Sequence, residues 1–255
     1  MKTILTSILV LIATISFAQD PPEKYQKIWN EINEGDVAKA QKELKKILKT
    51  KPKDPWPYWL MGQSFFLDPE NNSEQSKYFE QAIAADSTFA PAYYNLAGSL
   101  KSDSVNFPRI EKLYNKAIEL DKESYYYVAR ASLYQDWKKY DLAIKDCKSA
   151  KLIEPEDCYF ANQIIIRSLY DQGKIDELKQ FLKSNDPNNG GGPPEGEYQF
   201  FLGELYESWG EPQKACPYFK QAVEDTEFFL DIVDDPEVLT KQLEQYRAKA
   251  AATCK

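Results

Sequence analysis

The sequence predicts an all-α solenoid of about six helix-turn-helix repeats, closed by a C-terminal capping helix. Three observations support this: apolar residues recur with a period of about 34 residues, glycines and prolines mark the turns, and the last segment reads as an amphipathic helix. In the clearest repeat, Ala131 and Ala150 allow two antiparallel helices to approach closely, and Pro155 ends the second. Its marked positions are Tyr127, Arg130, Ala131, Tyr134, Ala143, Cys147, Ala150 and Pro155.

Residues 1–18 are expected to be a signal peptide that is removed after Ala18. Lys2 gives a positive start, residues 4–17 are apolar but too short to span a bilayer comfortably, and residues 16–18 offer small residues where a signal peptidase reads. An uncleaved anchor helix is the alternative, but residues 20–22 break a helix at once. We therefore expect an exported chain, periplasmic or secreted, without stable membrane insertion.

Four repeats are expected in residues 25–155. The first, residues 25–52, is the weakest, because Ile28 and Ile47 stand where small residues are usual; terminal repeats are commonly atypical in this way. Residues 59–85 form the second repeat, residues 90–121 the third, and residues 127–155 the fourth. The array as a whole is expected to cover residues 19–225.

The downstream part is expected to be interrupted once. A fifth repeat begins near residue 165, and its second helix gives way to a Gly/Pro-rich loop at about 184–196, either a tolerated insertion or a mobile flap. Residues 202–222 form the sixth repeat, whose second helix should start late or bend at Pro217. Residues 226–255 are expected to be the C-terminal capping segment, with Pro236 in the first turn of its helix.

Residues from about Lys24 to Asp225 resemble a tetratricopeptide repeat array. Residues 127–155 are similar to the family signature at eight positions, with Cys147 for the usual aromatic residue and Arg130 for the usual leucine. The resemblance implies a right-handed superhelix whose first helices line a concave groove that binds an extended peptide or a partner's helix. It implies a scaffold rather than an enzyme, and it carries no particular ligand.

The register of the first helix of each repeat indicates which side chains face the concave groove. In peptide-binding arrays of the family, an asparagine before the signature leucine grips the ligand backbone, as Asn95 would before Leu96. The carboxylate clamp of the family is not expected, because Trp56, Leu60 and Val128 stand near the places where its charges are needed. The candidate partner-binding residues are Trp59, Gln63, Tyr94, Asn95, Tyr125, Gln163, Arg167 and Phe200.

Three interpretations of the aromatic groove residues stay open: packing between helices, a strip that binds protein, and stacking on saccharide rings. We expect a peptide or protein partner of the envelope or exterior. A glycan-binding accessory protein that uses Trp59, Tyr94 and Tyr125 is the alternative. Oligomeric state is not indicated.

The composition argues against catalysis and nucleic-acid binding. Histidine is absent, which removes the commonest general base and zinc ligand, and without Lys2 the remaining 31 basic residues face 40 acidic ones, so the surface repels nucleic acid. Glu204 and Glu207 share a helix face, but such pairs are usually solvated surface. We expect no catalytic residue, no cofactor and no metal site.

The cysteines suit an exported chain. Cys216 lies near the start of the sixth repeat's second helix, and an antiparallel capping helix would return Cys254 to the same end, so a disulfide between them is expected. The segments around both residues resemble the cysteine-stapled tails of exported tetratricopeptide repeat proteins of the Bacteroidetes. Cys147 is expected to be a buried small hydrophobe.

Overall fold

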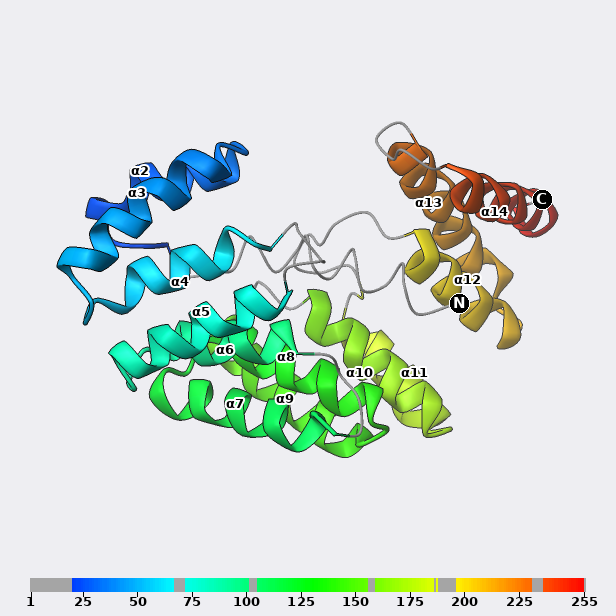
Figure 1. Ribbon diagram of the computed structural model, residues 1–255. Helices are drawn as coiled ribbons and strands as arrows, with labels where there is room; N and C mark the ends of the chain where they lie inside the picture. The colour runs from blue at the N-terminus through cyan, green and yellow to red at the C-terminus, as the bar shows by residue number, and fades with distance from the viewer. Residues whose placement is uncertain are drawn as a thin grey trace. The chain divides into compact units, whose positions relative to one another are not determined.

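The computed structural model describes residues 20–66, 72–100, 105–155, 159–185, 187, 196–230 and 236–254. These described residues form 13 α-helices and no strands, and successive helices pair antiparallel (Figure 1). The predicted all-α array of helical repeats is confirmed. The chain divides into two compact units, residues 1–191 and 192–255. The predicted signal peptide and most of the predicted Gly/Pro-rich loop lie outside the described residues.

The first unit contains five helix pairs within its described residues. The second helix of each pair also packs on the first helix of the next pair, so the pairs stack in chain order. The pairs are α2 (Glu23–Asn33) with α3 (Val37–Thr50), α4 (Pro55–Gln63) with α5 (Asn72–Ala85), α6 (Ala90–Ser99) with α7 (Phe107–Leu120), α8 (Ser124–Asp136) with α9 (Tyr140–Ile153), and α10 (Tyr159–Asp171) with α11 (Ile175–Ser184).

Small residues set the distance between paired helices. Ala131 on α8 and Ala143 on α9 are fully buried, as expected from their signature positions. Between α4 and α5, a Cβ atom on Gly62 would lie 2.4 Å from the ring of Phe79, so a larger residue would push the helices apart. The period read from the sequence is therefore a period of close helix contacts.

The tight turns inside four repeats share one backbone conformation. Gly35, Gly173 and Gly210 have φ of 88°, 70° and 73°, the left-handed region that glycine enters without steric cost. In the fourth repeat Lys138 takes this position with φ of 55°. At each turn the next residue donates its N–H to a carbonyl five residues back, for example Lys139 N to Tyr134 O at 2.7 Å.

Asp54 joins the first two pairs. It is the N-cap of α4 and accepts from the backbone N–H of Trp56 at 3.2 Å. Its carboxylate also accepts from Tyr25 Oη at 2.6 Å and from Lys24 Nζ at 2.9 Å, both on α2. One side chain thus caps a helix and ties it to a neighbour.

The second unit consists of α12 (Gly196–Ser208), α13 (Pro212–Leu230) and α14 (Glu237–Thr253), and α14 packs along α13. Of the two alternatives predicted for this helix, a late start or a bend at Pro217, the late start is wrong: α13 begins at Pro212 and continues through Pro217. The buried residues Ala215, Phe219 and Ala222 hold it against its neighbours, which offsets the backbone hydrogen bond that Pro217 cannot donate.

A disulfide closes the second unit. Cys216 near the start of α13 and Cys254, which follows the last residue of α14, are joined. Their Cα atoms are 5.1 Å apart and their sequence separation is 38. Cys147 is a buried free thiol in the first unit, and burial raises its pKa, so it stays protonated. Across the described residues, no helix is both long and apolar enough to cross a bilayer.

Candidate partner-binding surface

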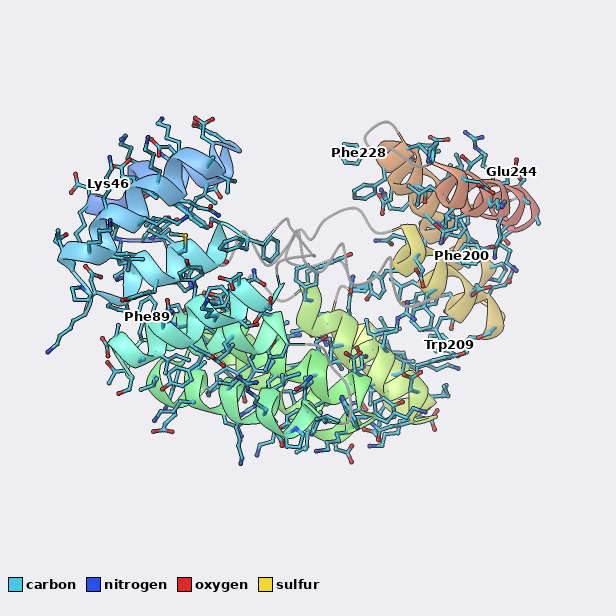
Figure 2. The ribbon with its side chains drawn as sticks, in the orientation of Figure 1. Lys46, Phe89, Phe200, Trp209, Phe228 and Glu244 are labelled. Atoms are coloured by element: carbon cyan, nitrogen blue, oxygen red, sulfur yellow. A yellow bond between two sulfur atoms is a disulfide. The ribbon has the colours of Figure 1, made fainter. Side chains whose placement is uncertain are left out.

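Seven of the eight predicted groove residues belong to the first unit. All of them lie on first helices of their pairs, as the register predicts. Phe200, labelled in Figure 2, lies on α12 and is described with the second unit. The seven are Trp59 and Gln63 on α4, Tyr94 and Asn95 on α6, Tyr125 on α8, and Gln163 and Arg167 on α10.

Trp59 and Asn95 connect two successive first helices. Nε1 of Trp59 donates a hydrogen bond to Oδ1 of Asn95 at 2.5 Å. An indole nitrogen can only donate, so the atom facing it is the amide oxygen, and the orientation of the Asn95 amide follows from the chemistry. The two N–H groups of Asn95 have no partner within the described residues, and the side chain is partly exposed.

Trp59 is itself part of the core. Its side chain is 0% exposed, and the rings of Trp29 and Trp56 each lie 5.5 Å from its ring between centroids. Trp56 in turn meets Phe89, labelled in Figure 2, at 4.8 Å. These contacts hold Trp59 in one position, and through the hydrogen bond they hold Asn95 as well.

Three other tyrosines gather around Tyr94, which is 7% exposed. Its ring lies 5.2 Å from Tyr125 and from Tyr126, and 6.0 Å from Tyr114. Burial raises the pKa of Tyr94, Tyr114, Tyr125 and Tyr126 well above the usual value, so all four hydroxyls stay neutral. Tyr125 is the partly exposed member of this tyrosine cluster that was predicted to line the groove.

The remaining predicted residues divide between core and surface. Gln63 is buried, whereas Gln163 and Arg167 are partly exposed and each has a partner in the protein. Phe200 is 7% exposed and stacks on Tyr246 of α14 at 4.4 Å. The predicted set that solvent reaches most is therefore Asn95, Tyr125, Gln163 and Arg167.

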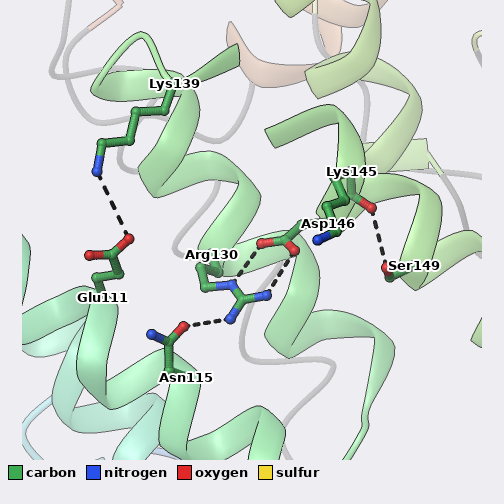
Figure 3. A network of polar contacts seen from close by, with 7 residues as sticks. All are labelled: Glu111, Asn115, Arg130, Lys139, Lys145, Asp146 and Ser149. Atoms are coloured by element: carbon green, nitrogen blue, oxygen red, sulfur yellow. Dashed lines mark hydrogen bonds and ion pairs between the residues drawn. The ribbon is translucent and has the colours of Figure 1, made fainter. Parts of the chain in front are cut away.

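A polar staple that sequence reasoning did not find joins three helices of the first unit (Figure 3). Arg130 on α8 donates from Nε and Nη2 to the two carboxylate oxygens of Asp146 on α9, at 2.7 and 2.8 Å. Its Nη1 also donates to Oδ1 of Asn115 on α7 at 2.5 Å. The signal was visible: an arginine stood at a signature position that is usually leucine, but its acidic partner could not be chosen from the sequence.

Of the acidic pair Glu204 and Glu207 on α12, Glu207 has a structural role. Glu207 accepts from Thr253 Oγ1 at 2.9 Å and forms an ion pair with Lys249, both on α14. The hydrogen bond from Lys249 lowers the pKa of Glu207, the opposite of what a general acid needs. Within the described ranges, no three Cys, Asp or Glu side chains gather so as to hold a metal ion.

Comparison with known proteins identifies part of the array. Residues 124–157 and 196–224 match the tetratricopeptide repeat family model. The chain carries tetratricopeptide repeats. The two matched segments correspond to the predicted fourth and sixth repeats, so both predictions are confirmed.

Several solved structures share the fold. PilW, described as a type IV pilus biogenesis factor, has a TM-score of 0.64 and 15% identity over 78% of this chain and 90% of its own. PilF of Pseudomonas aeruginosa has a TM-score of 0.58 and 15% identity, over 80% and 90%. YrrB, described as having an unusual peptide-binding site, has a TM-score of 0.52 and 14% identity, over 79% and 97%. No curated protein matches the sequence.

Proposed function

We propose that this chain is an exported scaffold or adaptor that binds a peptide or protein partner of the envelope or exterior through the first helices of its first unit. The observation that carries the proposal is the amide of Asn95. Its oxygen is occupied by Trp59, and its two N–H groups have no partner in the described protein. Export rests on the sequence of residues 1–18.

An amide held in this way suits a polypeptide backbone. Its N–H groups can donate to the carbonyl of an extended segment, and because the buried Trp59 already fixes its orientation, little entropy is lost on binding. The neighbouring tyrosine cluster is neutral. A partner segment that binds beside Asn95 and the tyrosine cluster is therefore recognised through hydrogen bonds and apolar contacts, and not through a charged terminus.

The glycan alternative is less well supported. Stacking on a sugar requires an exposed ring face, whereas Trp59 and Tyr94 are 0% and 7% exposed. Tyr125 is the one of the three that is partly exposed. We therefore propose protein binding and not sugar binding.

The test is an affinity pull-down from the native envelope fraction with the chain from Gln19 and with Asn95→Asp. A carboxylate at this position still accepts from Trp59 but donates nothing, so the fold is kept and the partner is lost. Gln180→Glu on the exposed surface of α11 makes the same charge change and should retain the partner. Equal recovery by all three chains would contradict the assigned surface.

Export is tested separately by intact mass. Expression with residues 1–18 present should yield a periplasmic or secreted chain that begins at Gln19. A chain that keeps Met1 in the cytoplasm would contradict export and leave the partner-binding proposal to its own test.

A further inference from the structure

The outward face of α3 carries four lysines that make no ion pair or hydrogen bond within the described residues. They are Lys42, Lys45, Lys46 and Lys49, and we call them the α3 lysine face; Lys46 is labelled in Figure 2. Together with Ala38 and Gln41 they line a shallow, open depression. Lys39, on the same helix, is different, because its Nζ lies 2.9 Å from the carboxylate of Glu31.

This face reverses the charge of the protein locally. Residues 37–53 hold seven lysines and one acidic residue, Glu43, whereas the whole chain has a net charge of −8. Lys42 and Lys46, and also Lys45 and Lys49, stand four residues apart, a spacing at which like charges repel and destabilise a helix. An anionic occupant would relieve that repulsion.

The side chains around the depression limit the kinds of molecule that can bind there. The apolar residues Ala40 and Leu44 of α3 point into the core, and the apolar residue that lines the depression is the small Ala38, so the face offers no large apolar side chain to insert into a bilayer. It has no aromatic ring on which a nucleic-acid base could stack. A lysine ammonium is a point charge that binds carboxylates in many geometries. It lacks the planar, forked guanidinium of arginine, which selects anions of one shape.

We propose that the α3 lysine face binds a carboxylate-rich polypeptide segment. Charge complementarity is the basis: the row from Lys42 to Lys49 runs about 10 Å along the helix, a length that a few successive glutamate or aspartate side chains cover. This site is on the second helix of its pair and is independent of Asn95 on α6. It thus goes beyond the proposed partner-binding surface.

The experiment measures fluorescence anisotropy of a labelled oligoglutamate peptide with the full mature chain at low and at high salt. The native chain should bind at low salt, and binding should weaken as salt rises. Replacing all four lysines of the face by glutamine should lower the affinity about tenfold, since each exposed pair contributes modestly. Asn95→Asp should bind the peptide as the native chain does, which separates this test from that of the proposed function.

A matched control removes four other exposed lysines that make no ion pair, Lys112, Lys122, Lys145 and Lys148. It has the same net charge and should lose less than about twofold in affinity; equal loss in both quadruple variants would overturn the site. Tighter lysine-dependent binding of heparin oligosaccharide or phosphatidylglycerol vesicles would overturn the polypeptide assignment. Self-association of the native chain that the α3 variant abolishes would reassign the face to a second copy. Far-UV circular dichroism checks that each variant is folded.

Discussion

Arg130 and Asp146 place a charged pair where the repeat signature usually has an apolar contact. Both side chains are largely covered, at 17% and 6% exposed. Two parallel hydrogen bonds satisfy the pair, but either charge alone would be left without its partner in a partly buried position.

Removing Asp146 should therefore cost more than removing the pair. We expect Asp146→Ala to lower the free energy of unfolding of the first unit by about 3 kcal/mol, because Arg130 keeps its charge without its partner. The double variant Arg130→Leu, Asp146→Ala should recover much of that loss. Urea unfolding followed by circular dichroism measures both, and a double variant less stable than Asp146→Ala would contradict the explanation.

Asp54 gives the first unit a dependence on acidic pH. Burial opposes its ionised form, but the hydrogen bonds from Tyr25, Lys24 and the Trp56 backbone outweigh burial and lower its pKa. A lowered folded-state pKa gives stability that is present above the unfolded-state value of about 4 and is lost as pH falls through the folded-state pKa.

Asp54→Asn should thus cost about 1 to 2 kcal/mol at neutral pH and progressively less as pH falls below the unfolded-state pKa of about 4. Asparagine can still cap α4, so the loss reports the charge rather than the cap. Urea unfolding of both chains across acidic pH measures the difference. A difference that does not change with pH would show that the Asp54 charge is not responsible.

The sequence could not predict which aromatic residues of the candidate surface are buried. Register places Trp59 and Tyr94 on first helices correctly, but it does not say which neighbouring helices cover them. Rings from α2 and α4 meet at Trp59, and rings from α6, α7 and α8 meet at Tyr94. The combined volume of these rings decides which of them is covered. Asn95, by contrast, was singled out by its place before Leu96, and its side chain is partly exposed.

At the scale of the elements, turn chemistry was readable where glycine supplied it. Gly35, Gly173 and Gly210 adopt the left-handed region at three turns, in agreement with the expectation that glycines mark the turns. Lys138 occupies the same conformation without that signal. In the sequence, the turn of the fourth repeat is therefore located only by the spacing of the two helices on either side of it.

Lys138→Gly should stabilise the first unit by about 0.5 to 1 kcal/mol, because the strain of a left-handed lysine exceeds the extra entropy that glycine loses on folding. The same substitution at Lys148, in the exposed middle of α9, should destabilise by about 1 kcal/mol. Thermal unfolding of the two variants measures the contrast. A destabilised Lys138→Gly chain would contradict the strain.

At the scale of the whole molecule, the two units differ in how they are held. The second unit has three described helices, and the bond between Cys216 and Cys254 closes a long loop within it. Periodicity indicated six repeats and a cap, but it could not show that the array divides near residue 191. That division depends on which helices pack, and the segment between α11 and α12 has no repeat signature.

Replacing Cys216 and Cys254 by serine should lower the stability of the second unit by about 4 kcal/mol, the entropy of closing a loop of this length in the unfolded chain. Hydrogen exchange followed by mass spectrometry should show lost protection in residues 196–254 and unchanged protection in residues 124–155. Cys147→Ala is the control, and its effect should be confined to the first unit. Equal loss of protection in both units would show that they unfold together.

Within each unit, the stacking of the helices on their neighbours in the chain also bears on how quickly the protein folds. In the described part of the molecule, the main helix contacts join elements one or two places apart in the order α2 to α14. Little loop entropy is lost before such contacts form, so folding can begin at any well-packed pair, such as α8 with α9, and spread in both directions. A weakened repeat then interrupts that spread locally, and the helices on either side of it can still assemble.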